Sequence, residues 1–198
     1  MSTSAPLPQQ RLAAVVLSGG GGVRLGGVDK SSIEVGGVTL LERAISATVA
    51  AEEVVVVGER VPTTRPVTWA REDPPGGGPA AGLLTGLDAF SRPPELLCVL
   101  AVDMPRVTPS TVVRLVDAVA ADPSVDGAML VDEAGRRQVL AAVYRYGALV
   151  SARPADREQE HGMSIRRLVA RLRVAEVAAV GKEARDVDTW EDLRELEE

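Results

Sequence analysis

The sequence predicts an α/β fold of three layers, in which helices cover both faces of a mostly parallel sheet. Short apolar runs such as 12–17 and 96–102 alternate along the chain with segments of helical periodicity. This order is typical of doubly wound sheets. The runs are apolar at every position, as expected for parallel strands that are covered on both faces. Such sheets bind their ligands at the carboxyl ends of the strands.

Most of this alternation lies in the first half of the chain. The helix predicted at 109–121 has the clearest start, because Thr108 can cap it and Pro109 suits the first helical position. The breaker-rich sequence P-P-G-G-G-P at 74–79 precedes another predicted helix. The predicted strands are 12–17, 53–58, 67–70 and 96–102, and the predicted helices are 39–51, 80–90 and 109–121.

The second half changes character. Apolar runs at 127–131 and 139–144 are joined by a polar segment and predict a β-hairpin or a pair of strands, a small β insertion after the main sheet. A helix at 164–172, a strand at 174–180 and a closing helix at 189–196 complete the pattern.

Length and composition limit the classes of protein. We expect a disordered tail at residues 1–10 and a single domain over 11–198, which is long enough to bury a full core. The net charge of −6 argues against broad binding of nucleic acid. No apolar run reaches the length of a membrane span, and the single Cys98 suits a reducing cytoplasm, where it is expected to be a small buried apolar residue.

A glycine-rich segment, L-S-G-G-G-G-V-R-L-G-G-V-D-K at 17–30, follows the first strand. It fits neither the Walker loop, because Asp29 precedes Lys30, nor the dinucleotide fingerprint, whose third glycine would fall on Arg24 or Leu25. Backbone N–H groups on such a turn can still approach an anion while Arg24 and Lys30 neutralise its charge. A solvated turn remains the alternative.

Four motifs in the same order resemble those of the molybdenum cofactor guanylyltransferases, the MobA-like family of the nucleotidyltransferase superfamily. After the glycine segment come R-E-D with G-G-G-P-A-A-G, then A-V-D-M-P, and finally D-V-D-T-W-E-D-L. The resemblance covers nearly the whole chain and implies a Rossmann-like nucleotidyltransferase fold. It also implies an enzyme that transfers GMP from GTP to molybdopterin, with Mg²⁺ as cofactor.

The resemblance also assigns residues. The nucleotide would contact the start of the glycine segment, and Asp73 would hydrogen-bond its base or ribose, although a turn-capping role explains Asp73 as well. Asp103, at the end of a buried strand, would be the Mg²⁺ ligand and a catalytic residue together with Arg24 and Lys30. The residues expected to contact the nucleotide are Leu17, Ser18, Gly19, Gly20, Arg24, Lys30, Asp73 and Asp103.

Other residues carry open alternatives. Asp186 or Asp188 stands where the family has asparagine, and could be a second metal ligand or cap the last helix. The segment R-R-Q-V-L-A-A-V-Y-R at 136–145 resembles the family's acceptor-side strand, so its arginines Arg136, Arg137 and Arg145 could face the pterin phosphate, whereas a solvated turn explains the first two equally well.

Two residues of the next segment carry milder expectations. The lone His161 is expected in a polar loop without a catalytic role. Ser164 is expected to cap the following helix, on which Arg166 could be functional but is most simply exposed.

The family's pattern is not matched everywhere. Gly21, Gly22 and Val23 stand where the family often carries charge, which keeps other superfamily members open: a molybdopterin cytidylyltransferase, or an enzyme that activates a sugar or another phosphorylated metabolite. Gly19-Gly20, in place of the Ala-Gly of cytidylyl relatives, favours guanine. A catalytically silent nucleotide-binding accessory protein is a further alternative. The implied partners are GTP, molybdopterin and, transiently, other cofactor biosynthesis proteins, for a monomer or weak oligomer.

Overall fold

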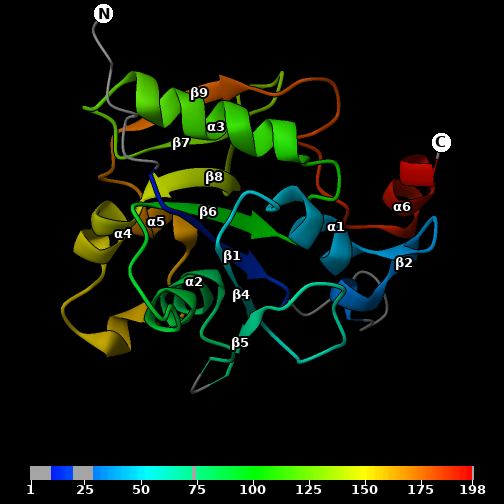
Figure 1. Cartoon of the computed structure of the whole chain (residues 1–198), viewed down its shortest axis with the longest axis horizontal. Helices are drawn as coiled ribbons and strands as arrows, with labels where there is room; N and C mark the ends of the chain where they lie inside the picture. The colour runs from blue at the N-terminus through cyan, green and yellow to red at the C-terminus, as the bar shows by residue number, and fades with distance from the viewer. Residues whose placement is uncertain (1–9, 20–28, 73–74, 198) are drawn as a thin grey trace, which may run out of the picture.

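The computed structural model describes residues 10–19, 29–72 and 75–197, and shows a seven-stranded sheet between layers of helices (Figure 1). The strand order is β5-β4-β1-β6-β8-β7-β9. All neighbouring pairs are parallel except the two that involve β8. The predicted α/β class with a mostly parallel sheet is therefore confirmed.

Four strands from the first half form one side of this sheet. They are β1 (Leu12–Leu17), β4 (Glu53–Val57), β5 (Thr68–Ala70) and β6 (Leu96–Ala101). Every residue of β1 and β6 is buried, which is why their sequences lack polar positions. Both run in register beside each other and end at the same edge, at Leu17 and Ala101.

Helices cover the two faces of the sheet. On one face α1 (Leu40–Ala47) and α3 (Pro109–Ala121) share an apolar cluster with Ala14 and Val16 of β1. On the other, α2 (Pro79–Asp88), α4 (Tyr146–Ala152) and α5 (Ile165–Leu168) share a cluster with Ala13 and Val15. Figure 1 shows α1 and α3 on the opposite side of the strands from α2.

The strands of the second half are β7 (Gly127–Val131), β8 (Arg137–Arg145) and β9 (Val174–Ala178). The predicted hairpin exists, because β7 and β8 are antiparallel neighbours. It is not an addition beside the sheet, however: β8 pairs directly with β6 and lies inside the sheet. The apolar segment Ala141–Tyr144 is fully buried there, which explains why β8 takes an internal position.

Several short elements differ from the predictions. Thr39 caps α1, as the start predicted at 39 suggests, but the helix ends at Ala47, four residues early. An unpredicted two-stranded ribbon, β2 (Glu34–Val35) and β3 (Val38–Thr39), turns through Gly36 and Gly37, both with positive φ. The helix α4 follows β8 without a break and was also not predicted.

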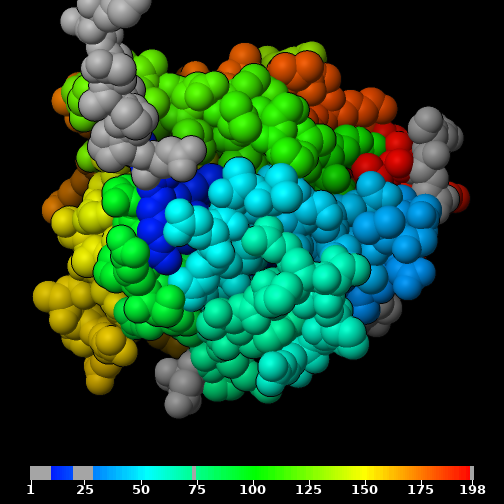
Figure 2. Space-filling view, in the orientation of Figure 1, coloured from blue at the N-terminus to red at the C-terminus, as the bar shows by residue number. Residues whose placement is uncertain are grey.

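The last helix, α6 (Trp190–Glu197), packs beside β2, at one edge of the face seen in Figure 2. It agrees with the helix predicted at 189–196. Cys98 is fully buried within β6, and burial raises the pKa of its thiol to about 12. In the described part of the chain, no helix has the length and apolar character needed to cross a membrane.

Candidate functional site

A cavity of about 620 Å³ opens at the edge where β1, β4 and β6 end. Its lining includes Leu17, Ser18 and Gly19 after β1, and Asp103 after β6. Another part of its wall comes from residues 75–78, which precede α2, and from the first turn of that helix. The structure thus has a cavity at the predicted location, the carboxyl ends of the parallel strands.

The ends of β1 and β4 are joined tightly at Ser18. Its backbone N–H and its hydroxyl both donate to the carbonyl oxygen of Val57, at 3.0 and 3.1 Å. The chain then passes Ser18 so closely that a Cβ on Gly58 would lie 2.0 Å from the Ser18 Oγ. Only glycine fits at position 58 without a shift of the cavity wall, a role that the sequence analysis did not assign.

A cationic group meets two carboxylates beside this cavity. The Lys30 Nζ lies 2.7 Å from Asp188 Oδ1, 3.0 Å from the carbonyl oxygen of Val187 and 3.7 Å from Asp103 Oδ2. The lysine side chain is only 14% exposed. Residues at positions 30, 103 and 188 are thus brought together from three distant parts of the chain.

Burial raises the pKa of Asp103, and the nearby carboxylates of Asp186 and Asp188 raise it further, while the Lys30 ammonium opposes the shift. Since the Asp103 side chain is one-third exposed and lines the cavity, a ligand that carries positive charge can reach it. A partly buried carboxylate whose negative charge is only partly balanced by the protein is suited to binding a cation.

This arrangement fits Mg²⁺ as a cofactor. Within the described ranges, no group of three or more histidine, cysteine or acidic side chains forms a protein cage for a metal. Mg²⁺ does not need one, because it usually takes one or two carboxylates and completes its shell with substrate phosphates and water. Asp103 therefore suits the protein's share of a magnesium site.

Glu72 lines the cavity, and the sequence analysis assigns it no role. Its Oε2 accepts a hydrogen bond of 2.8 Å from the backbone N–H of Gly77, and a Cβ on Gly82 would lie 2.9 Å from its Oε1. This hydrogen bond links Gly77, just before α2, to the end of β5, and Gly82 leaves room for the Glu72 carboxylate. Within the R-E-D motif at 71–73, the family resemblance assigns a role only to Asp73.

Three predicted site residues, Gly20, Arg24 and Asp73, lie outside the described residues. Their assignments stay predictions. The same holds for Gly21, Gly22 and Val23, at which the chain departs from the family's pattern.

The arginines of the acceptor-side strand are occupied elsewhere. Arg136 pairs with Asp132 at 2.7 Å and Arg137 with Glu176 at 2.8 Å, both near the surface. Arg145 donates to the carbonyl oxygens of Val125 and Val119, at 2.8 and 3.1 Å. These contacts stabilise the hairpin and the end of α3, and none of the three arginines lines the cavity.

Two predictions about the following segment are confirmed. Ser164 caps α5 by accepting a hydrogen bond of 3.2 Å from the Arg167 N–H, and Arg166 is exposed. His161 is exposed in the turn after a short 3₁₀ helix, Arg157–Glu160.

Comparisons with solved structures show the same fold. Molybdopterin-guanine dinucleotide biosynthesis protein A from Archaeoglobus fulgidus superposes with a TM-score of 0.69 at 21% identity, over 93% of this chain and 96% of its own. The 2-C-methyl-D-erythritol 4-phosphate cytidylyltransferase of Thermus thermophilus gives a TM-score of 0.66, also at 21% identity, over 94% and 97%.

Relatives with closer sequences are named for one activity. A probable molybdenum cofactor guanylyltransferase of Chloroflexus aggregans is 31% identical over 156 residues, 74% of this chain and 72% of the relative. The molybdenum cofactor guanylyltransferase of Acidiphilium cryptum is 38% identical over 116 residues, 52% of this chain and 56% of the relative. A match of 33% to a relative from Natronomonas pharaonis covers 48% of this chain and half of that protein.

The family model described as the MobA-like NTP transferase domain matches residues 14–180. This range includes the residues that line the cavity and both edge strands of the sheet, β5 and β9. On this match, and on the shared fold, the chain belongs to the MobA-like NTP transferase family, a family of nucleotidyltransferases.

Proposed function

We propose that this protein is a molybdenum cofactor guanylyltransferase, which transfers GMP from GTP to molybdopterin and releases pyrophosphate. The observation that carries the proposal is the meeting of Lys30 and Asp103 beside a cavity at the carboxyl edge of the sheet. The names of the relatives from Chloroflexus aggregans and Acidiphilium cryptum support the choice of nucleotide and acceptor.

The proposed reaction is an in-line displacement at phosphorus. A terminal phosphate oxygen of molybdopterin attacks the α-phosphorus of GTP and forms the new P–O bond. The bond between the α-phosphorus and the bridging oxygen to the β-phosphate breaks, and pyrophosphate leaves with the electron pair. Because the nucleophile is already anionic, the reaction needs positioning and charge stabilisation rather than a general base. The exposed His161 therefore has no required part.

Each described residue has a physical role in this reaction. Backbone groups at Leu17, Ser18 and Gly19 would contact the nucleotide at the end of β1, and Lys30 would neutralise charge on the phosphates as it builds toward pyrophosphate. Asp103 would hold Mg²⁺, which supplies charge neutralisation on the phosphate oxygens. Arg24, Gly20 and Asp73 would complete the nucleotide site.

The cellular location and the oligomeric state are part of the same proposal. Molybdopterin and GTP are small anionic substrates, and we propose that the protein meets them in the cytoplasm as a monomer or weak oligomer. Contacts with other cofactor biosynthesis proteins would be transient.

The test is an assay with each common nucleoside triphosphate. The purified protein is mixed with Mg²⁺, molybdopterin and one nucleotide, and pyrophosphate release is followed, with a control that omits the acceptor. We expect release with GTP and acceptor together. Faster release with CTP would replace the proposal with a cytidylyltransferase, and release with a sugar phosphate in place of molybdopterin would replace the acceptor. Binding of GTP without turnover would indicate an accessory protein.

A further inference from the structure

Lys30 is held in place more firmly than a lysine that only awaits a substrate. Its ammonium has oxygen atoms from Asp188, Val187 and Asp103 within 2.7 to 3.7 Å. Lysine is a flexible point charge that loses side-chain freedom when it is held. Because Lys30 is held before a nucleotide binds, nucleotide binding does not have to restrict its side chain further.

The segment that holds Lys30 is itself anchored. The Val187 N–H donates to the Asp103 carbonyl oxygen at 2.7 Å, which ties the segment to the residue after β6. Asp192 Oδ2 accepts hydrogen bonds from the N–H groups of Asp188 and Thr189, at 3.2 and 2.9 Å. The Asp192 N–H in turn donates to Thr189 Oγ1 at 3.2 Å, in the reciprocal pattern of a capping box at the start of α6.

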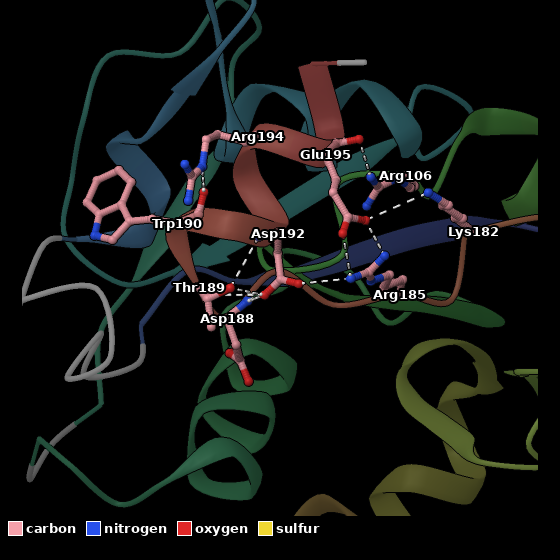
Figure 3. Close-up of polar contacts among 9 residues, drawn as sticks. All are labelled: Arg106, Lys182, Arg185, Asp188, Thr189, Trp190, Asp192, Arg194 and Glu195. Carbon is pink, nitrogen blue, oxygen red and sulfur yellow. Dashed lines mark hydrogen bonds and ion pairs between the residues drawn. The ribbon is translucent and has the colours of Figure 1, made fainter.

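Arg185 connects this cap to the rest of α6. It pairs with Asp192 at 3.2 Å and with Glu195, while Arg106 donates to the Glu195 carbonyl oxygen at 2.8 Å. Figure 3 shows these groups gathered above the Asp188 backbone, with the Asp188 side chain pointing away from them. The Asp188 carboxylate thus contacts Lys30 from a segment that several hydrogen bonds and ion pairs hold in place.

We propose that Asp188 is a positioning residue: its carboxylate holds the Lys30 ammonium beside Asp103, so that the phosphates of a nucleoside triphosphate meet a charge already in place. The inference rests on the proposed function for the identity of the substrate. It also assigns Asp188 a role different from metal ligation, because the atom 2.7 Å from its Oδ1 is the lysine nitrogen. In this proposal, residues 187 and 188 near the C-terminus contribute to the site by positioning Lys30.

The direct test measures the reactivity of Lys30. Lys30 and Lys182 are the only lysines of the chain, and Lys182 is 64% exposed, so one protein contains the probe and its control. A brief pulse of acetic anhydride, followed by mass spectrometry of peptides, reports each amine. We expect Asp188→Ala to raise the labelling rate of Lys30 about tenfold, as the loss of one charge-assisted hydrogen bond implies, with Lys182 unchanged.

The conservative variant separates holding from folding. In Asp188→Asn the amide oxygen still accepts a hydrogen bond but carries no charge, so the labelling rate of Lys30 should rise less than in Asp188→Ala. Equal Lys30 labelling in wild type and Asp188→Ala would overturn the inference. A rise at both lysines would do so too, because it would indicate general loosening of the fold.

Kinetics separate positioning from metal binding. We expect Asp188→Ala to lower kcat/KM for GTP about tenfold and Asp188→Asn to restore most of it, with the Mg²⁺ concentration for half-maximal rate unchanged in both. If both variants raise the Mg²⁺ requirement, Asp188 is a metal ligand and the inference is wrong. Asp117→Ala, at an exposed position on α3, is the matched control.

Failure of the proposed function has a separate signature. If the wild type does not turn over GTP with molybdopterin, the function is wrong. Lysine labelling, and its suppression by GTP with Mg²⁺, still decides whether Asp188 holds Lys30 for a nucleotide.

Discussion

Two carboxylates, one at the cavity and one in the second half of the chain, show opposite behaviour. The pKa of Asp103 is raised, chiefly by burial. Burial acts in the same direction on Glu183, but hydrogen bonds from the Thr111 hydroxyl, the Val180 N–H and the Arg114 guanidinium outweigh it and lower the pKa. The carboxylate of Glu183 accepts hydrogen bonds from three groups of the protein, whereas the negative charge of Asp103 is only partly balanced.

The difference separates structural charge from functional charge. In the second half of the chain, charged residues such as Arg145 and Glu183 have partners that the protein itself supplies. Beside the cavity, by contrast, burial and the carboxylates of Asp186 and Asp188 disfavour the charged form of Asp103, and the Lys30 ammonium does not outweigh them. Residue type alone does not distinguish these two cases; the number of partners does.

The largest expected effect is on turnover. Asp103→Ala should lower kcat about a thousandfold, because the proposed Mg²⁺ loses its protein ligand. Pyrophosphate release measures the rate, and circular dichroism should show an intact fold. A variant that keeps wild-type activity contradicts the metal assignment.

The matching change at Glu183 should act on stability instead. Glu183→Ala leaves the Thr111 hydroxyl and the Val180 N–H without their acceptor and is expected to lower the free energy of unfolding by about 2–4 kcal/mol. Urea denaturation measures the change. Under conditions where the variant stays folded, kcat should fall far less than in Asp103→Ala; an equal fall would erase the contrast between the two carboxylates.

The close approach between β1 and β4 gives a third test. In Gly58→Ala the new methyl group meets Ser18 Oγ, and overpacking of this kind is expected to cost about 1–3 kcal/mol of stability. Nucleotide affinity, followed by calorimetry, should fall as well, because the clash lies in the cavity wall. Adding Ser18→Ala removes the Oγ and should recover part of the stability. No recovery in the double variant would show that the clash is not the cause.

Arg145 tests whether the second half contacts the acceptor. Arg145→Ala removes two hydrogen bonds to backbone carbonyl groups and should destabilise the fold by about 1–2 kcal/mol. The KM for molybdopterin should not change, since the side chain does not line the cavity. A rise of about tenfold in that KM would restore the acceptor role that the resemblance implies.

The smallest effects are in the pH dependence of stability, measured without Mg²⁺. The native pKa of Asp103 lies above its ordinary value of 3.8, so its stabilising contribution is complete below pH 3.8 and is lost as pH rises through the native pKa. Asp103→Asn should therefore gain stability relative to wild type as pH rises.

Glu183 should show the opposite sign. Its native pKa lies below the ordinary value of 4.5, so it stabilises the fold above pH 4.5 and loses this contribution as pH falls through the native pKa. The deficit of Glu183→Gln against wild type should narrow in acid. Parallel pH profiles of the two variants would contradict the comparison.

The fold was largely predictable where local pattern and tertiary environment agree. The strands β1 and β6 are apolar at every position because both faces are covered, and the Thr-Pro pair marks the start of α3. The place of β8 between β6 and β7 was not predictable, because pairing partners depend on the whole sheet. The ribbon turn at Gly36-Gly37 could have been predicted, since two glycines between short β-prone pairs favour a hairpin.

The site was predictable to the extent that strand ends can be found. Asp103 and Lys30 were singled out from their positions after the strand and in the glycine segment, and the structure brings them within 3.7 Å of each other. The contact of Lys30 with Asp188 spans the length of the chain, and no local pattern indicates it. Glu72 and Gly58 stand at predicted strand ends, but the sequence assigns them no role, because their roles depend on backbone groups of other segments.

The antiparallel direction of β8 leaves one edge of the cavity open to modification. Because β8 runs against β6, its first residues and the turn at 132–136 lie at the same edge as the cavity, and Leu140 lines it. An insertion in that turn would lengthen an exposed loop and leave the pairing of β8 with β6 unchanged. The edge of the cavity can therefore be remodelled from an exposed turn that the buried core does not constrain.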